Sequence, residues 1–154
     1  MLIKDRLAAL NIVLPDPPQA AANYVPFVVV GSMVYVAGQV PRRRGKLEFA
    51  GKLGADFDAA AGGQAARLCG LNILAQVMLA CAGDLDRVVR CVRLTGYVNC
   101  TPSFAEQPRV IDGASDLIVE VFGDRGRHAR TAVGAAALPG NAACEIESLF
   151  EIRV

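Results

Sequence analysis

The 154-residue sequence has no tryptophan, a single histidine and almost no excess of charge of either sign. Sixteen lysines and arginines stand against fifteen aspartates and glutamates, which gives a net charge of +1. Surfaces for nucleic acids or anionic membranes need concentrated positive charge, so this balance argues against both partners. No apolar run approaches the about 20 residues of a membrane-spanning helix, and the N-terminus lacks a signal peptide's apolar core. We therefore predict a cytoplasmic protein.

Cysteine is present, but not in the spacings that bind metals. The five cysteines include no C-x-x-C pair and are odd in number, and one histidine cannot form an H-x-x-x-H pair. These patterns indicate reduced thiols used as small core residues, without a zinc site or a disulfide framework. Nucleotide-binding glycine patterns and the G-x-S-x-G turn are also missing, so a Ser-His-Asp triad would need residues distant in sequence. We expect no metal and no cofactor.

Apolar side chains, by contrast, are abundant. Hydrophobic residues make up 53% of the sequence, and the mean hydropathy is +0.36. A chain of this length buries roughly 68–70% of its unfolded surface, enough for one stable domain. We expect that domain to span residues 1–154, with residues 1–23 as an N-terminal extension packed on it. The high hydropathy indicates an apolar face covered by a second subunit.

Hydrophobic periodicity predicts the order β-β-α-β-α-β-β, preceded by a short helix near residues 3–10. The first two strands read as a hairpin around Gly31 and Ser32, and Gly83 should end the first long helix. The second long helix could be capped by Thr101 or Ser103. Its buried apolar stripe would be Val110, Ala114, Leu117, Ile118 and Val121. In sequence order the expected elements are 25–30, 33–37, 59–82, 87–98, 109–122, and a closing hairpin of 131–137 with 144–154.

Alternation along the strands assigns side chains to the two faces of the sheet. In strand 87–98 one face would carry Val88, Val92, Leu94 and Val98, and the other Cys91, Arg93, Thr95 and Tyr97. In helix 59–82, Gln76 falls on the side away from the apolar stripe. Two β-α-β crossovers place both long helices on one face of a mixed sheet, an α+β sandwich. The half-polar opposite face would then meet another subunit.

Charged residues near the C-terminus could carry chemistry, although a structural role stays open for each. Arg130 can grip a planar carboxylate through two parallel hydrogen bonds, or it can form an ordinary ion pair at a strand end. Glu145, Glu147 and Glu151 share one face of the last strand. A partly buried carboxylate there could position or deprotonate a water, whereas the alternative is a solvated face.

Two further groups have equally open roles. His128 could act as a general acid or base, or it could simply pack within its loop. The basic loop Arg42-Arg43-Arg44 could contact phosphates, or it could be a solvated turn.

Residues 24–41, 64–99 and 128–147 carry a family resemblance. Their most specific part is the ending H-A-R-T-A-V-G…L-P…E-I-E, supported by Y-V-P-F-V-V-V-G-S-M-V-Y-V-A-G-Q-V-P near the start. Together they resemble the RidA/YjgF family of reactive-intermediate deaminases, also labelled endoribonuclease L-PSP. The resemblance covers nearly everything after residue 20. It implies a chorismate-mutase-like fold and a homotrimer with a site at each subunit interface.

The resemblance also implies roles for individual residues. Arg130 would bind the carboxylate of the substrate, and Glu145 would handle the water that attacks an imine. Tyr24 would line the pocket, and Gly38 would bring its backbone beside the ligand. The sequence departs from common family residues at four positions, which marks a divergent branch: Ala37 for serine, Gly113 for asparagine, His128 for proline and Ala132 for cysteine.

Three functions follow as hypotheses. The first is hydrolytic deamination of 2-imino or enamino acids to 2-keto acids and ammonia, favoured by Arg130 and Glu145. The second is a non-catalytic trimer that binds keto or amino acids, favoured by Ala37 and Gly113. The third is an endoribonuclease, which the near-zero net charge and single histidine make the weakest.

Overall fold

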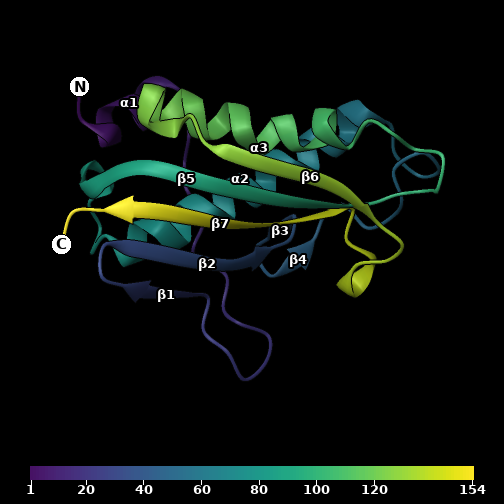
Figure 1. Ribbon diagram of the computed structural model, residues 1–154, viewed down its shortest axis with the longest axis horizontal. Coiled ribbons are helices and arrows are strands. Elements are labelled where there is room, and N and C mark those ends of the chain that lie inside the picture. Colours follow the sequence, from purple (N-terminus) through teal and green to yellow (C-terminus); the bar gives the residue numbers. More distant parts are fainter.

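The computed structural model describes residues 1–154 and contains a five-stranded sheet with helices packed against it (Figure 1). The helices are α1 (Ile3–Ala9), α2 (Ala59–Ala80) and α3 (Gln107–Phe122), with 3-10 turns at Leu85–Arg87, Gly123–Gly126 and Pro139–Asn141. The strands are β1 (Phe27–Val30), β2 (Met33–Gln39), β3 (Arg42–Arg43), β4 (Lys46–Leu47), β5 (Val88–Asn99), β6 (Ala129–Ala135) and β7 (Cys144–Ile152). The predicted element order is confirmed, and the basic loop adds the small β3–β4 hairpin.

The sheet has the strand order β1-β2-β7-β5-β6, and only β5 and β6 run parallel. Helices α2 and α3 lie side by side against one face, and α2 lies behind the sheet in Figure 1. The core-facing residues of β7 are all buried beneath them: Cys144, Ile146, Ser148, Phe150 and Ile152. The structure therefore confirms the α+β, chorismate-mutase-like sandwich, with its other sheet face left uncovered.

The predicted closing hairpin is wrong. Strand β7 lies between β2 and β5, and β6 pairs with the far side of β5. The chain enters β6 from α3, so β5-α3-β6 is a crossover unit, which produces a parallel pair. The Leu-Pro-Gly-Asn turn suggested a hairpin, but the connection spans residues 136–143, longer than the usual two to five residues.

Strand β5 also differs from simple alternation. Its pairing with β7 shifts between Val88 and Arg90 and again between Cys91 and Arg93. These irregularities direct Val88, Cys91 and Leu94 into the core at a spacing of three residues. Cys91 was predicted on the opposite face and is instead fully buried, while Val92 is only partly buried.

Helix α2 is covered on two sides. The side that carries Gln76 was predicted to lie away from the apolar stripe, yet this residue is fully buried. Its Nε2 donates a hydrogen bond of 2.7 Å to the carbonyl oxygen of Pro18, in the segment that precedes β1. Ile12 and Leu14 of the same segment pack against the core. The N-terminal segment thus supplies the second cover of α2.

Helix α3 begins without the predicted cap. Its N-cap residue is Glu106, which makes no side-chain capping bond, and neither Thr101 nor Ser103 serves instead. Pro108 occupies the first turn, where a backbone N–H has no partner within the helix, so the N–H that proline lacks costs no helical hydrogen bond. The predicted apolar stripe is confirmed, because Val110, Ala114, Leu117, Ile118 and Val121 are all fully buried.

The two long helices touch backbone to backbone at a pair of glycines. A Cβ added to Gly113 of α3 would overlap the carbonyl oxygen of Gly63 in α2 and lie 3.0 Å from its Cα. No side chain fits at this position. The asparagine expected there from the family resemblance has no space in this chain, so Gly113 is a packing residue.

This contact predicts opposite effects for two alanine substitutions. Gly113→Ala should lower the free energy of unfolding by about 1–3 kcal/mol, because the helices must separate. Gly63→Ala should be neutral or raise it by up to about 1 kcal/mol, since alanine favours helix. The new Cβ at position 63 would lie 4.0 Å from its nearest neighbour, the carbonyl oxygen of Arg109. Urea denaturation followed by circular dichroism at one protein concentration measures both, and equal effects would contradict the contact.

Candidate functional site

Arg130 lies at the free edge of the sheet, on the side of the helices. It pairs with Leu94, whose side chain faces the core, so its own side chain points toward α3. There Nη1 donates hydrogen bonds of 2.7 Å to Oδ1 of Asp112 and 3.2 Å to Oγ of Ser115. These acceptors are three residues apart, on one face of α3. The helix therefore orients the guanidinium.

The remaining edge of this guanidinium is open to a ligand. Both intrachain bonds use Nη1, and neither Nε nor Nη2 has a partner in the chain. Nε and Nη2 together form the planar pair of donors that matches the two oxygens of a carboxylate. The side chain is 24% exposed, which leaves that edge reachable.

Ser115 and His128 extend the cluster around Arg130. The His128 Nε2 atom lies 2.9 Å from Oγ of Ser115, and its Nδ1 atom lies 2.6 Å from the carbonyl oxygen of Gly126. A carbonyl only accepts, so Nδ1 carries the proton and Nε2 accepts from the serine hydroxyl. Burial lowers the pKa of His128, with a smaller lowering by Arg130, against the opposing effect of the Gly126 carbonyl. The imidazole is therefore neutral at pH 7.

Glu145 lies on the opposite, uncovered face of the sheet. Its carboxylate sits over Gly38, where an added Cβ would overlap Oε1. Gly38 falls in an irregularity of β2, where the pairing with β7 shifts between Val36 and Gln39. Burial raises the pKa of Glu145, and the charge of Glu147 raises it further. The absence of a side chain at Gly38 thus makes room for a half-buried carboxylate that can accept a proton.

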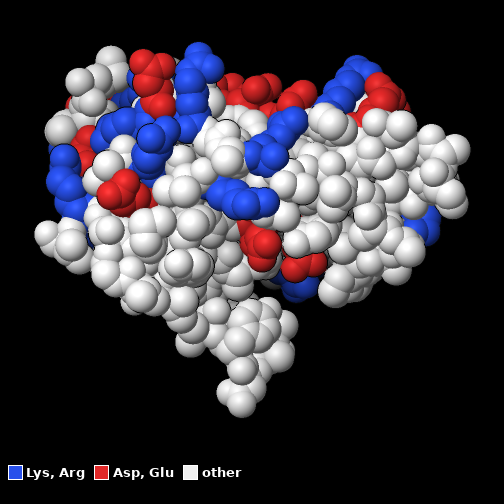
Figure 2. Space-filling model, in the orientation of Figure 1, with Lys and Arg blue, Asp and Glu red and all other residues white.

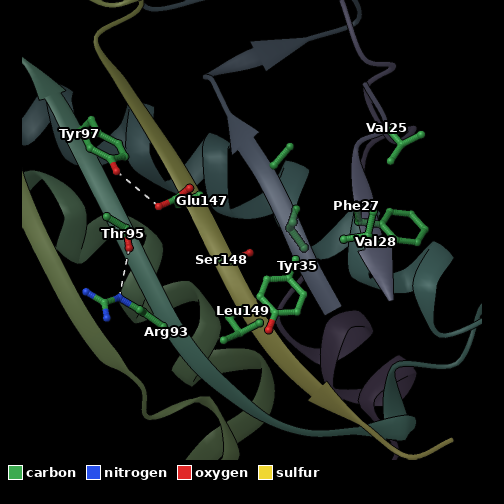
Figure 3. A pocket seen from close by; sticks show the side chains of 12 residues that line it. Val25, Phe27, Val28, Tyr35, Arg93, Thr95, Tyr97, Glu147, Ser148 and Leu149 are labelled. Carbon is green, nitrogen blue, oxygen red and sulfur yellow. Dashed lines mark hydrogen bonds between the residues drawn. The ribbon is translucent and has the colours of Figure 1, made fainter. Parts of the chain in front are cut away.

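A cavity of about 590 Å³ on this uncovered face is lined by Glu147, and Figure 3 shows its other lining residues from β1, β2, β5 and β7. The Tyr97 hydroxyl donates to Glu147 at 3.4 Å, and this carboxylate raises the pKa of Tyr97. Arg93 donates to the hydroxyls of Thr95 and Thr131. Ala37 lines the cavity without adding a polar group.

Charge on this face is mixed. Figure 2 shows basic and acidic side chains interleaved over the upper part of the face, with more of both signs near its middle and an uncharged lowest part. In the basic loop Arg43 pairs with Glu48 at 3.0 Å, whereas the Arg42 side chain donates only to the Gly45 carbonyl. A phosphate backbone would find no continuous positive surface in this view.

The structure brings only some of the predicted site residues together. Glu145 and Gly38 are in contact, whereas Tyr24 is 54% exposed in the segment before β1. Arg130 of β6 pairs with Leu94 of β5, which in turn pairs with Ser148 of β7. Glu145 lies three residues along β7 from Ser148, so Arg130 and Glu145 are two strand spacings and three residues apart. That offset corresponds to about 14 Å between Cα atoms, and the two side chains point to opposite faces. One chain alone cannot place Arg130 and Glu145 on the same ligand.

Sequence reasoning missed Ser115 and Asp112 as partners of Arg130. Their only signal was a spacing of three on an amphipathic helix, which is too common to mark a site. No group of three or more histidine, cysteine, aspartate or glutamate side chains is placed to hold a metal ion. None of the helices combines the length and apolar character needed to cross a membrane.

The raised pKa of Glu145 predicts how stability depends on pH. The native carboxyl holds its proton to a higher pH than the unfolded one, whose pKa is about 4.3, so its ionisation destabilises the fold as pH rises. Glu145→Gln should therefore be more stable than the natural protein at pH 7. This difference should shrink as the pH falls below about 4. Denaturation midpoints at both pH values measure it, and a constant difference would argue against a perturbed Glu145.

Comparisons with known proteins agree with this architecture. Residues 4–152 match the family described as "YjgF/chorismate_mutase-like, putative endoribonuclease". The chain is 48% identical over 148 residues to protein TCP17 of Trypanosoma cruzi, covering 96% of this chain and 92% of the relative. The crystal structure of Atu1372 from Agrobacterium tumefaciens, a protein of unknown function, is 48% identical with a TM-score of 0.91, covering 98% and 92%.

A more distant relative marks the position of the chain within the family. RidA from the Antarctic bacterium Psychrobacter sp. PAMC 21119 is 26% identical with a TM-score of 0.60, covering 89% of this chain and 94% of that one. The fold is shared, but the fit is much looser than that to Atu1372. The family match spans nearly the whole sequence, and so this chain belongs to the YjgF/chorismate-mutase-like family, in a branch that diverges from RidA.

Proposed function

We propose that the protein hydrolyses small 2-imino or enamino acids to 2-keto acids and ammonia. The observation that supports this most is the held guanidinium of Arg130, whose Nε and Nη2 atoms remain open for a carboxylate. The half-buried Glu145, with its raised pKa, supplies the second requirement, a carboxylate able to take a proton from water.

The proposed reaction uses these two groups in sequence. Arg130 binds the substrate carboxylate, which places the neighbouring imine carbon at a fixed distance from the guanidinium. Glu145 accepts a proton from a water as its oxygen adds to that carbon. Glu145 returns this proton to the nitrogen of the adduct formed from the protonated imine. The C–N bond then breaks, the proton of the added hydroxyl passes to the departing ammonia, and the products are the 2-keto acid and an ammonium ion. One water is consumed, and no cofactor takes part.

The proposed site needs two copies of the chain, because Arg130 and Glu145 lie on opposite faces. The uncovered sheet face is suited to such an assembly. Val28, Tyr35 and Tyr97 are 48%, 48% and 36% exposed there, a density of large apolar side chains that favours burial against another subunit. Together with the family resemblance, this supports a homotrimer with sites between subunits.

A protein that binds keto or amino acids without turnover would use the same guanidinium of Arg130. The absence of a hydroxyl at Ala37 is the feature that favours it. Binding and turnover are therefore measured separately in the tests that follow.

Replacing each of two neighbouring glutamates by glutamine distinguishes a catalytic role from a purely electrostatic effect on a neighbour. Glu145→Gln should bind keto acids normally but lose turnover by about 100-fold or more, since a general base contributes roughly 10²–10⁴-fold. Glu147→Gln should keep the maximal rate. Its loss of negative charge lowers the pKa of Glu145, so the acid limb of the rate profile should move to lower pH.

The measurements are steady-state kinetics with 2-imino acids generated in situ and calorimetry with the product keto acid. Full turnover in Glu145→Gln would contradict the proposed mechanism. Normal binding combined with no turnover in the natural protein would favour the non-catalytic alternative.

Mixing inactive subunits tests whether the site is shared. Arg130→Ala and Glu145→Gln should each be inactive alone. If they are unfolded and refolded together in equal amounts, about a quarter of the interfaces should combine an intact Arg130 with an intact Glu145 by random assortment. Activity should then return to about a quarter of the natural level. Sedimentation equilibrium checks that the mixture is trimeric, and no recovery in a trimeric mixture would contradict a shared site.

A further inference from the structure

The hydroxyl of Ser115 lies between a base and a cation. Its Oγ atom is 2.9 Å from Nε2 of His128 and 3.2 Å from Nη1 of Arg130. A serine inside a helix commonly bonds to the backbone of its own helix, but this hydroxyl makes no such bond. Ser115 and His128 are both partly exposed, so this cluster lies at the surface of the chain.

The hydrogen-bond directions are those of an activated nucleophile. Because Nδ1 of His128 donates to the Gly126 carbonyl, Nε2 offers its lone pair to the serine proton. Arg130 donates to the same Oγ, so positive charge faces the oxygen as the proton leaves. A hydroxyl, a base in contact with it and a third group that orients the base are the parts of a nucleophilic site. Here the Gly126 carbonyl is the orienting group.

We propose that Ser115 is a nucleophilic serine, activated by His128, that accepts acyl groups from small esters carrying a carboxylate. The open Nε and Nη2 atoms of Arg130 bind the carboxylate and so select anionic esters, whose acyl group must extend past Nη1 to reach Oγ. This activity is independent of Glu145, which lies on the other face of the sheet. It shares only Arg130 with the proposed deamination.

The acyl transfer proceeds in two balanced steps. Oγ bonds to the acyl carbon while Nε2 takes its proton, and the ester C–O bond breaks as that proton passes to the departing oxygen. Water then adds to the acyl carbon and gives a proton to Nε2. The bond to Oγ breaks, the carboxylic acid leaves, and the proton returns to the serine.

The test uses 2-acetoxybenzoate, whose acetyl group and carboxylate sit on adjacent ring carbons, with phenyl acetate as the uncharged ester. Peptide mass spectrometry locates the added acetyl group over time. The exposed Ser103 in the same protein serves as an internal reference. Ser115 should be acetylated about 100-fold faster than Ser103 by 2-acetoxybenzoate, consistent with general-base assistance. The preference over Ser103 should be smaller with phenyl acetate.

Single substitutions test the role of each residue in the proposed acylation site. His128→Gln keeps a hydrogen-bonding side chain without a base and should slow acetylation of Ser115 by about 100-fold. Arg130→Gln should remove the preference for the anionic ester. In Glu145→Gln, Ser115 should be acetylated at the same rate as in the natural protein. Circular dichroism confirms that each is folded. Acetylation of Ser115 no faster than that of Ser103, together with release of 2-hydroxybenzoate by the natural protein no faster than by His128→Gln, would overturn the proposal. Equal rates in the natural protein and a folded His128→Gln would also overturn it. If Glu145→Gln loses deamination but Ser115 is acetylated at an unchanged rate, the result supports two separate activities.

Discussion

The parallel pairing of β6 with β5 governs where every charged group of the candidate site lies. Because Arg130 is paired with the core-facing Leu94, its side chain must turn toward α3 and away from the uncovered face. Had β6 paired directly with β7 as a hairpin, Arg130 and Glu145 would lie on adjacent strands. The crossover through α3 instead places β5 between them. The need for a second copy of the chain at the proposed deamination site follows from this pairing.

Helix α3 positions the side chains that hold the Arg130 guanidinium in place. It is held against α2 at the contact of Gly113 with Gly63, which fixes its height above the sheet. From there Asp112 and Ser115, one turn apart, hold Nη1 of Arg130. The 3-10 turn that follows α3 brings His128 back to Ser115. Side chains from one helix and one strand thus orient the guanidinium before any ligand binds, which reduces the entropy lost on binding.

Much of the fold could be predicted from the sequence, because periodicity reports burial directly. The alternation of β7 and the stripe of α3 are where the pattern placed them. The errors arose where a long-range contact overrode a local pattern. Cys91 turns inward because β5 is irregular against β7, and Gln76 is buried because a segment distant in sequence covers it. Of the site, the charged residues were recognisable by type, but the face on which each lies depends on strand order, which a single sequence does not encode locally.

The two faces create different electrostatic conditions, and these suit different chemistry. Burial raises the pKa of Glu145, and the negative charge of the neighbouring Glu147 raises it further, so Glu145 holds a proton more easily. His128 stands beside Arg130, where a positive neighbour and burial keep the imidazole neutral and able to accept a proton. Burial is the larger cause of the shifted pKa in each case, and repulsion from a neighbour of like charge adds to it. In the two proposed reactions Arg130 anchors an anionic substrate for each of them: for Glu145 across a subunit boundary, and for His128 through Ser115 within one chain.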